Sequence, residues 1–195
     1  MDFSISSVFF LIISHYAWDV EGQRYNTTFI TVPNGGRWGT WGPVQFCPRP
    51  RGYAHGFSLK IQTFLGPGTR FDDTAMNGIR LYCENGAVIE SAVAPWGLWT
   101  KPKFCHKGYG PLRAFSMRVE PDQGSGDDTA VNDVQFICGE KHKLFGGGLN
   151  WGTFDKWSKA CPDGYVCGLQ TKVQEDQGEG DNTGLNDIKL FCCSG

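Results

Sequence analysis

The sequence predicts an all-β fold built from three copies of one unit of about 55 residues. Three observations carry this prediction: an eight-residue motif occurs three times, each unit opens with an aromatic–glycine motif, and apolar and polar residues alternate with period two. Charged residues make up only 19% of the chain, whereas 27 residues are glycine, a composition typical of strands and turns. A sheet with one apolar face is unstable alone in water, so three such sheets must bury those faces together.

The segment before the repeats is predicted to be a signal peptide covering residues 1–22. Its apolar run, Ile5–Ile13, is too short to span a bilayer but long enough for the hydrophobic region of such a peptide. Ala17 and Gly22 are small, so cleavage is expected after residue 17 to 22. We therefore expect a secreted, extracellular protein, glycosylated at Asn26 in the sequon Asn26-Thr27-Thr28.

The remaining residues, 23–195, are predicted to form a single domain whose repeats span about 31–84, 85–139 and 140–193. The motif begins with a pair of acidic or amide residues followed by threonine in every copy. Its three copies are residues 72–79 (DDTAMNGI), 127–134 (DDTAVNDV) and 181–188 (DNTGLNDI). The opening motifs are residues 38–41 (WGTW), 96–99 (WGLW) and 151–154 (WGTF).

Each unit is long enough for about four strands of ordinary length. One inward-facing set comprises Phe57, Leu59, Ile61, Phe115, Met117, Val119, Leu169, Thr171 and Val173; a second comprises Ile79, Leu81, Val134, Phe136, Ile188 and Leu190. Two architectures place three such sheets around one core: a β-prism with pseudo-threefold symmetry and three four-stranded sheets, or a β-trefoil. The repeated tryptophans are expected to fill the shared axis, and an exposed one would instead offer a surface for stacking on sugar rings.

The eight cysteines suit an oxidising compartment. Eight cysteines allow 105 pairings, but equivalence of the repeats favours joining the opening cysteine of each unit to its closing cysteine. The expected disulfides are Cys47–Cys83, Cys105–Cys138 and Cys161–Cys192, which leaves Cys167 for Cys193. No metal site is expected, because no C-x-x-C pair is present and no histidine lies at ligand spacing from a cysteine cluster.

The acidic pairs of the repeated motif are interpreted as turn-forming residues, since Asp and Thr ahead of a strand bond to backbone amides. A glycosidase pair or a calcium site at residues 124–128 and 178–181 is the weaker alternative. A single catalytic site must break threefold symmetry, so unmatched carboxylates are better candidates: Glu84, Glu90, Glu120, Glu140, Asp155, Glu175 and Asp176. No pair can be chosen among them and no nucleophile motif is present, so an enzyme is not the favoured prediction and no cofactor is expected.

The repeated D-D-T-A-x-N motif, the W-G-x-W openings, residues 167–172 (CGLQTK) and the terminal Phe191-Cys192-Cys193 resemble the vitelline membrane outer layer protein 1 family. The resemblance covers the chain from about Thr31 onward. It implies a β-prism, the four disulfides above and an extracellular location. It also implies a structural role in an egg outer coat and action on N-acetylglucosamine oligosaccharides. The disulfides, the repeats and the missing catalytic motif favour a secreted structural component of an extracellular coat or mucosal fluid that binds carbohydrate containing N-acetylglucosamine, and the alternative is weak transfer or hydrolysis of chitooligosaccharides.

The expected partners are extracellular coat proteins or carbohydrate. Nucleic acid is not expected, because the net charge is only −2 and there is no run of Lys or Arg. Membrane association is not expected either, and the protein is predicted to be a monomer.

Overall fold

The computed structural model describes residues 27–50, 52–63, 74–121, 130–176, 178 and 183–194. The predicted signal peptide, Asn26, the acidic pairs of the three motifs and residues 124–128 lie outside this part of the chain.

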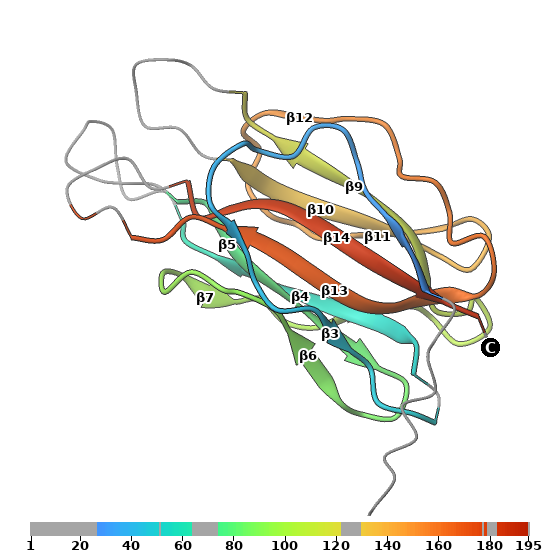
Figure 1. The fold of residues 1–195 in the computed structure, drawn as a ribbon. Coiled ribbons are helices and arrows are strands. Elements are labelled where there is room, and N and C mark those ends of the chain that lie inside the picture. Colours follow the sequence, from blue (N-terminus) through green and yellow to red (C-terminus); the bar gives the residue numbers. More distant parts are fainter. Residues whose placement is uncertain are drawn as a thin grey trace, which may run out of the picture.

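Three antiparallel sheets make up the fold (Figure 1), each with a path of four strands. The first sheet has the order β6 (Val88–Glu90), β5 (Met76–Cys83), β4 (Ala54–Ile61) and β7 (Leu98–Trp99), with β8 (Lys103–Phe104) also beside β4. The second has the order β11 (His142–Phe145), β10 (Val131–Cys138), β9 (Leu112–Val119) and β12 (Thr153–Phe154). The third has the order β1 (Thr27–Ile30), β14 (Leu185–Cys193), β13 (Tyr165–Val173) and β2 (Thr40–Trp41), with β3 (Gln45–Phe46) also beside β13. Within the described residues no helix is long and apolar enough to cross a membrane.

The three sheets bury their apolar faces against one another, which confirms the β-prism and makes the β-trefoil alternative wrong. The predicted inward-facing residues of the central long strands are buried: Ile79, Leu81, Val134, Phe136, Ile188 and Leu190 have no exposed surface. The first long strand of each sheet follows the same rule, with Leu59, Met117 and Leu169 fully buried. Period-two alternation therefore identified the core residues correctly.

The expectation that tryptophans fill the axis is wrong. Phenylalanine supplies the largest fully buried side chains, with Phe57 and Phe136 in contact at 4.5 Å between ring centroids. No tryptophan in the described segments is buried. Trp99 instead lies on an outer face beneath Arg80, whose guanidinium carbon is 3.7 Å from the ring centroid, because a cation gains energy over an aromatic face while remaining hydrated.

Each sheet is completed by the opening strand of the next unit. Strand β7 of the second unit pairs with β4 of the first, and β12 of the third unit pairs with β9 of the second. Strand β2 of the first unit closes the ring by pairing with β13 of the third, and β1 pairs with β14 beside it. A sequence unit and a sheet are therefore not the same set of residues.

The disulfides of the structure are Cys47–Cys83, Cys105–Cys138, Cys161–Cys192 and Cys167–Cys193, the pairs expected from the repeat. Because of the strand exchange, the first of these joins two different sheets. The Cys47 amide donates to Cys167 of the third sheet, whereas Cys83 ends β5 of the first. Cys105 and Cys161 bond to the first and second sheets in the same way, so three bridges link the sheets in a ring.

The repeated motif closes one end of the prism. In the third unit, Asn186 faces inward, fully buried, and its Nδ2 donates to Thr183 Oγ1 at 2.7 Å and to the Gly184 carbonyl at 3.3 Å. Asn77 makes the equivalent bonds in the first unit. In both units the threonine hydroxyl and a motif carbonyl accept from the buried asparagine amide group, so threonine and asparagine act as a pair.

Candidate functional site

At the end of the prism where the motifs lie, each loop that precedes a W-G motif packs between two sheets, and we call each such place a corner. Three equivalent backbone hydrogen bonds define them: Gly36 donates to Asn186, Ala94 to Asn77 and Leu149 to Asn132, at 2.6, 2.8 and 2.9 Å. The structure therefore aligns the three corners residue by residue, and their differences can be compared directly.

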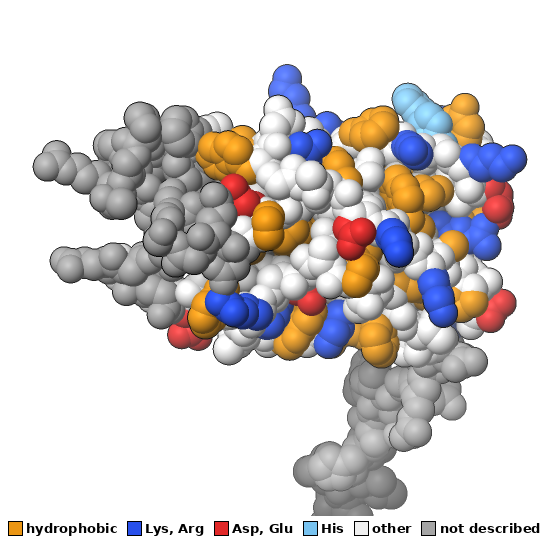
Figure 2. Space-filling view, turned by 90° about the horizontal axis from the view of Figure 1, so that it is seen from above, with side chains coloured by type: hydrophobic (Ala, Val, Ile, Leu, Met, Phe, Trp, Pro, Cys, Tyr) orange, Lys and Arg blue, Asp and Glu red, His pale blue; other side chains and the backbone are white. Residues whose placement is uncertain are grey.

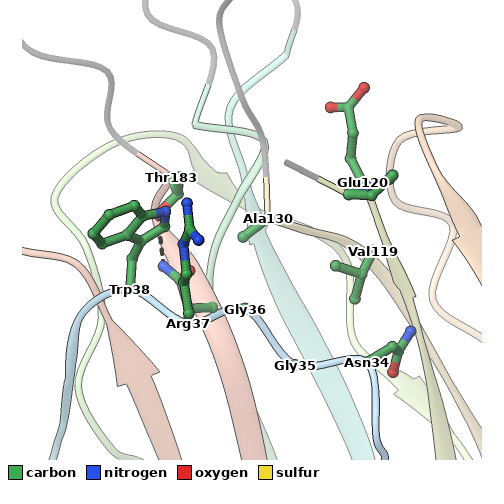
Figure 3. A pocket seen from close by; sticks show the side chains of 11 residues that line it. Asn34, Gly35, Gly36, Arg37, Trp38, Val119, Glu120, Ala130 and Thr183 are labelled. Carbon is green, nitrogen blue, oxygen red and sulfur yellow. Dashed lines mark hydrogen bonds between the residues drawn. The ribbon is translucent and has the colours of Figure 1, made fainter. Parts of the chain in front are cut away.

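The first corner, between the third and second sheets, contains a cavity of about 240 Å³. It is lined by Asn34, Gly35, Gly36, Arg37, Trp38, Val119, Glu120, Pro121, Ala130, Thr183 and Asn186. Figure 3 shows Arg37 and Trp38 on one side and Val119 and Glu120 on the other, with the backbone of Gly35–Gly36 running between them. Asn34 ties the loop to the second sheet by donating from Nδ2 to the Met117 carbonyl at 2.9 Å.

This corner differs from the other two in its loop. Gly36 stands where the other corners have Ala94 and Leu149, so a side chain is missing at the centre of the loop. A Cβ at Gly36 would lie 2.5 Å from Asn186 Oδ1, so the Asn186 side chain would have to shift to admit a larger residue there. Arg37 follows, in place of Pro95 and Asn150.

The opposite wall differs as well. Glu120 donates its backbone amide to Ala130, as Gln62 does to Ala75 and Gln174 to Gly184. The two glutamines accept hydrogen bonds from the motif threonines through Oε1, from Thr74 and Thr183 respectively. A carboxylate has replaced an amide at this one position, and it lines the cavity.

The cavity presents an exposed aromatic ring beside charged and amide groups. Trp38 is 49% exposed, and the Arg37 guanidinium carbon lies 4.6 Å from its ring centroid. The Arg37 side chain therefore already rests on the indole through a cation–π contact. An indole surface with a guanidinium, a carboxylate and an amide nearby suits a ligand that has both an apolar face and hydrogen-bonding groups.

The half-buried carboxylate of Asp187 packs against the loop of the first corner. Gly35 packs so closely on Asp187 that a Cβ would overlap the carboxyl group, and Asp187 Oδ1 accepts a hydrogen bond from the Ile188 amide at 2.8 Å. Burial raises the pKa of Asp187, although that hydrogen bond and the charges of Lys172 and Lys189 oppose the shift. Asp133 repeats this arrangement in the second sheet, where burial again raises the pKa.

Of the seven candidate carboxylates, Glu120 lies at the cavity and the other six are not among its lining residues. Glu90 forms an ion pair with Arg80 at 2.7 Å, and Glu140 pairs with Arg113. Glu84, Asp155, Glu175 and Asp176 are exposed. The described residues thus bring one candidate to the cavity rather than the pair that glycoside hydrolysis uses.

The sequence predictions did not include Trp38, Arg37 or Gly36 as site residues. The sequence does contain a signal for Gly36: when the W-G motifs are aligned, Gly36 stands at the position of Ala94 and Leu149, so one repeat lacks a side chain there. The spatial meeting of that loop with Glu120 could not be seen, since it depends on how the third sheet packs beside the second.

The described residues thus form a pseudo-threefold β-prism whose first corner contains a cavity. The same fold occurs in solved lectin structures. A prostate-specific WGA16 glycoprotein lectin superposes with a TM-score of 0.53 at 13% identity, covering 85% of this chain and 99% of that one. Artocarpin in complex with mannotriose gives 0.51 at 14% identity, with coverages of 86% and 96%.

The family is shown by sequence. The model of the family described as vitelline membrane outer layer protein I matches residues 28–195. The chain is 48% identical over 188 residues to the mouse (Mus musculus) vitelline membrane outer layer protein 1 homolog, covering 92% of this chain and 90% of that protein. The human (Homo sapiens) homolog is 47% identical over 180 residues, with coverages of 89% and 86%. The chain belongs to the vitelline membrane outer layer protein I family.

Proposed function

We propose that the protein is a secreted component of an extracellular coat or mucosal fluid that binds carbohydrate containing N-acetylglucosamine in the first-corner cavity. The single observation that carries this proposal is the cavity itself, where an exposed indole lies beside hydrogen-bonding side chains. An indole packs well on the apolar face of a sugar ring, and nearby polar groups fix its orientation.

Two further findings support the proposal. Proteins with this fold include lectins, one of them solved with mannotriose bound, and family members are described as outer layer proteins. The four disulfides and the N-terminal apolar segment favour passage through an oxidising secretory pathway. Mass spectrometry of protein secreted by cultured cells tests this part: we expect a new N-terminus after residue 17 to 22 and a glycan on Asn26.

Binding is tested by titrating chitotriose, the trimer of N-acetylglucosamine, into the purified protein in a calorimeter. We expect saturable binding to one site, and Trp38→Ala to weaken it at least about tenfold, because stacking on an exposed aromatic ring contributes on the order of 1 kcal/mol or more. Phe145→Ala is the matched control, since Phe145 is an exposed aromatic residue, 58% accessible, that does not line the cavity. Unchanged binding after Trp38→Ala would place the ligand elsewhere, and no heat with any amino-sugar oligomer would refute carbohydrate binding.

A further inference from the structure

We propose that Glu120 is the residue that makes the first corner, and neither of the other two, a recognition site: its carboxylate accepts hydrogen bonds from neighbouring hydroxyl groups of a neutral sugar. This inference rests on the proposed function and names the chemistry of the same cavity.

The repeat shows that the scaffold does not need a charge at this position. Gln62, Glu120 and Gln174 occupy equivalent places at the ends of β4, β9 and β13, with equivalent backbone hydrogen bonds of 2.8, 3.0 and 3.0 Å. In two of the three copies an amide oxygen bonds to the motif threonine. An uncharged side chain therefore serves the fold here, and the carboxylate is a departure from it.

The carboxylate of Glu120 lies at the cavity of the first corner. Glu120 belongs to the second sheet and lines the cavity together with the loop of residues 34–38. By the repeat, Gln174 and Gln62 belong to the corners where Ala94 and Leu149 stand in place of Gly36. The missing side chain at Gly36 and the added charge at Glu120 come from different sheets and from positions 84 residues apart. Both lie at the first corner and line its cavity (Figure 3).

The charges of the cavity indicate which ligands it accepts. Arg37 and Glu120 lie on facing walls, one a donor and the other an acceptor, so the net charge of the pair is zero. A cationic ligand would meet Arg37 and an anionic one Glu120, whereas a neutral sugar derivative offers an acceptor to the first and donors to the second. A carboxylate accepts two hydroxyl hydrogen bonds, and such charge-assisted bonds are about twice as strong as neutral ones.

The equivalent residues Gln62 and Gln174 indicate which substitution tests the role of Glu120. Glu120→Gln introduces the side chain that both equivalent positions already carry, so the fold is retained and the thermal midpoint should stay close to that of the wild type. We expect Glu120→Gln to weaken chitotriose binding about tenfold, and the control Glu84→Gln, a change at an exposed carboxylate away from the cavity, to leave it unchanged.

A second measurement separates hydrogen bonding to the ligand from a purely structural role. The methyl glycoside of N-acetylglucosamine and its 3-, 4- and 6-deoxyfluoro analogues are titrated against both proteins by ligand-observed NMR, since fluorine cannot donate a hydrogen bond. The wild type should lose affinity for the analogues altered at the recognised hydroxyls, and Glu120→Gln should lose less, because its amide has one acceptor oxygen where the carboxylate has two.

The two proposals fail differently. If the wild type and Glu120→Gln bind chitotriose equally while Trp38→Ala does not, the cavity binds sugar but Glu120 has no role in recognition. If Glu120→Gln is weaker yet remains as sensitive to the fluorine substitutions as the wild type, the carboxylate shapes the site without accepting the hydroxyls. If the wild type binds no amino-sugar oligomer at all, the proposed function itself is wrong.

Discussion

At the scale of single residues, one glycine in each W-G motif explains why the motif is repeated. Gly39, Gly97 and Gly152 have φ angles of +82°, +77° and +72°, a region that side chains disfavour. A Cβ at each would also overlap the backbone of the neighbouring sheet, at Val173, Ile61 and Val119 respectively. Glycine is therefore required twice over, for the turn and for the close approach that lets the next strand join the sheet.

Replacing Gly97 separates these two requirements when it is compared with Gly86. Gly86 also has a positive φ, +87°, but no atom lies within 4 Å of the place where its Cβ would be. We expect Gly86→Ala to lower the free energy of unfolding by about 1 kcal/mol and Gly97→Ala by about 3 kcal/mol, because only the second adds steric overlap. Urea denaturation measures both, and equal losses would show that overlap at Gly97 is relieved without cost.

Asp187 should make stability depend on pH. Burial raises its pKa in the folded protein, so the fold holds the proton more tightly than the unfolded chain does. The stability due to the protonated form is complete below 3.8, the ordinary pKa of an aspartate, and is lost as pH rises through the raised pKa of the folded state. Asp187→Asn should therefore gain stability relative to the wild type from about pH 3.5 upward and then level off, as followed by thermal unfolding. The exposed residue Asp163 provides the control variant Asp163→Asn, and parallel curves for all three proteins would contradict this.

The alternation of apolar and polar residues predicted which residues form the core, but the prediction that the tryptophans lie in it was wrong. Period two assigns each side chain to a face, which is why Leu59, Met117 and Leu169 were placed correctly. The pattern does not say that an aromatic side chain on the outer face can be covered by a cation. Lys189 lies 4.0 Å from the Trp41 ring centroid on such a face, and Figure 2 shows hydrophobic and basic side chains interspersed over one side of the molecule.

At the scale of elements, the contact between each loop and its sheet is kept by reciprocal changes of size. In the first sheet Gly78 lies beneath Val93, where a Cβ on the glycine would come within 2.7 Å of Val93 Cγ1. At the other two corners the sheet carries the side chain and the loop the glycine. A Cβ on Gly35 would overlap the Asp187 carboxyl group, and a Cβ on Gly146 would overlap the Asp133 carboxyl group. A side chain on one partner therefore meets a glycine on the other.

A double-mutant experiment tests this reciprocity. Gly78→Asp should lower the free energy of unfolding by about 2 kcal/mol, because the new side chain overlaps Val93. Adding Val93→Gly should recover a large part of that loss by copying the pair Asp187 and Gly35, even though Val93→Gly alone is destabilising. The interaction energy comes from denaturation curves of the four proteins, and simple additivity would mean that the two positions do not substitute for one another.

The long strands could be predicted from the sequence, whereas the exchange of short strands could not. Strands β2, β7 and β12 have two residues each, too few for period two to show. Their partners are fixed by the closure of the prism, so the sequence places them in a unit but not in a sheet.

At the scale of the whole molecule, the disulfides act between sheets as well as within one. Removing Cys47–Cys83 or Cys167–Cys193 by paired serine substitutions should lower the free energy of unfolding by about 3 to 4 kcal/mol each, since the closed loops span 36 and 26 residues. Hydrogen exchange should then tell them apart. Loss of Cys47–Cys83 should accelerate exchange in both the first and the third sheet, and loss of Cys167–Cys193 in the third alone. Non-reducing peptide mapping checks the pairs in solution, and any other connectivity would contradict the ring.

The prism and its disulfides could be predicted because the repeat imposes equivalence on three units at once. The cavity could not, because it arises where that equivalence fails in two sheets together, at Gly36 and at Glu120. A search for unmatched carboxylates found one member of the cavity among seven candidates, and only the packing of the sheets selected it.

The pairing of β1 and β2 with β14 and β13 also bears on how the chain is made. The first and second sheets need only segments that are close in sequence, so they can assemble while synthesis is still under way. The third must wait until β13 and β14 have been synthesised, since it pairs residues 27–46 with residues 165–193. Until then the first and second sheets expose the apolar faces that the third sheet will cover. A nascent chain halted before Leu185 should therefore stay bound to chaperones.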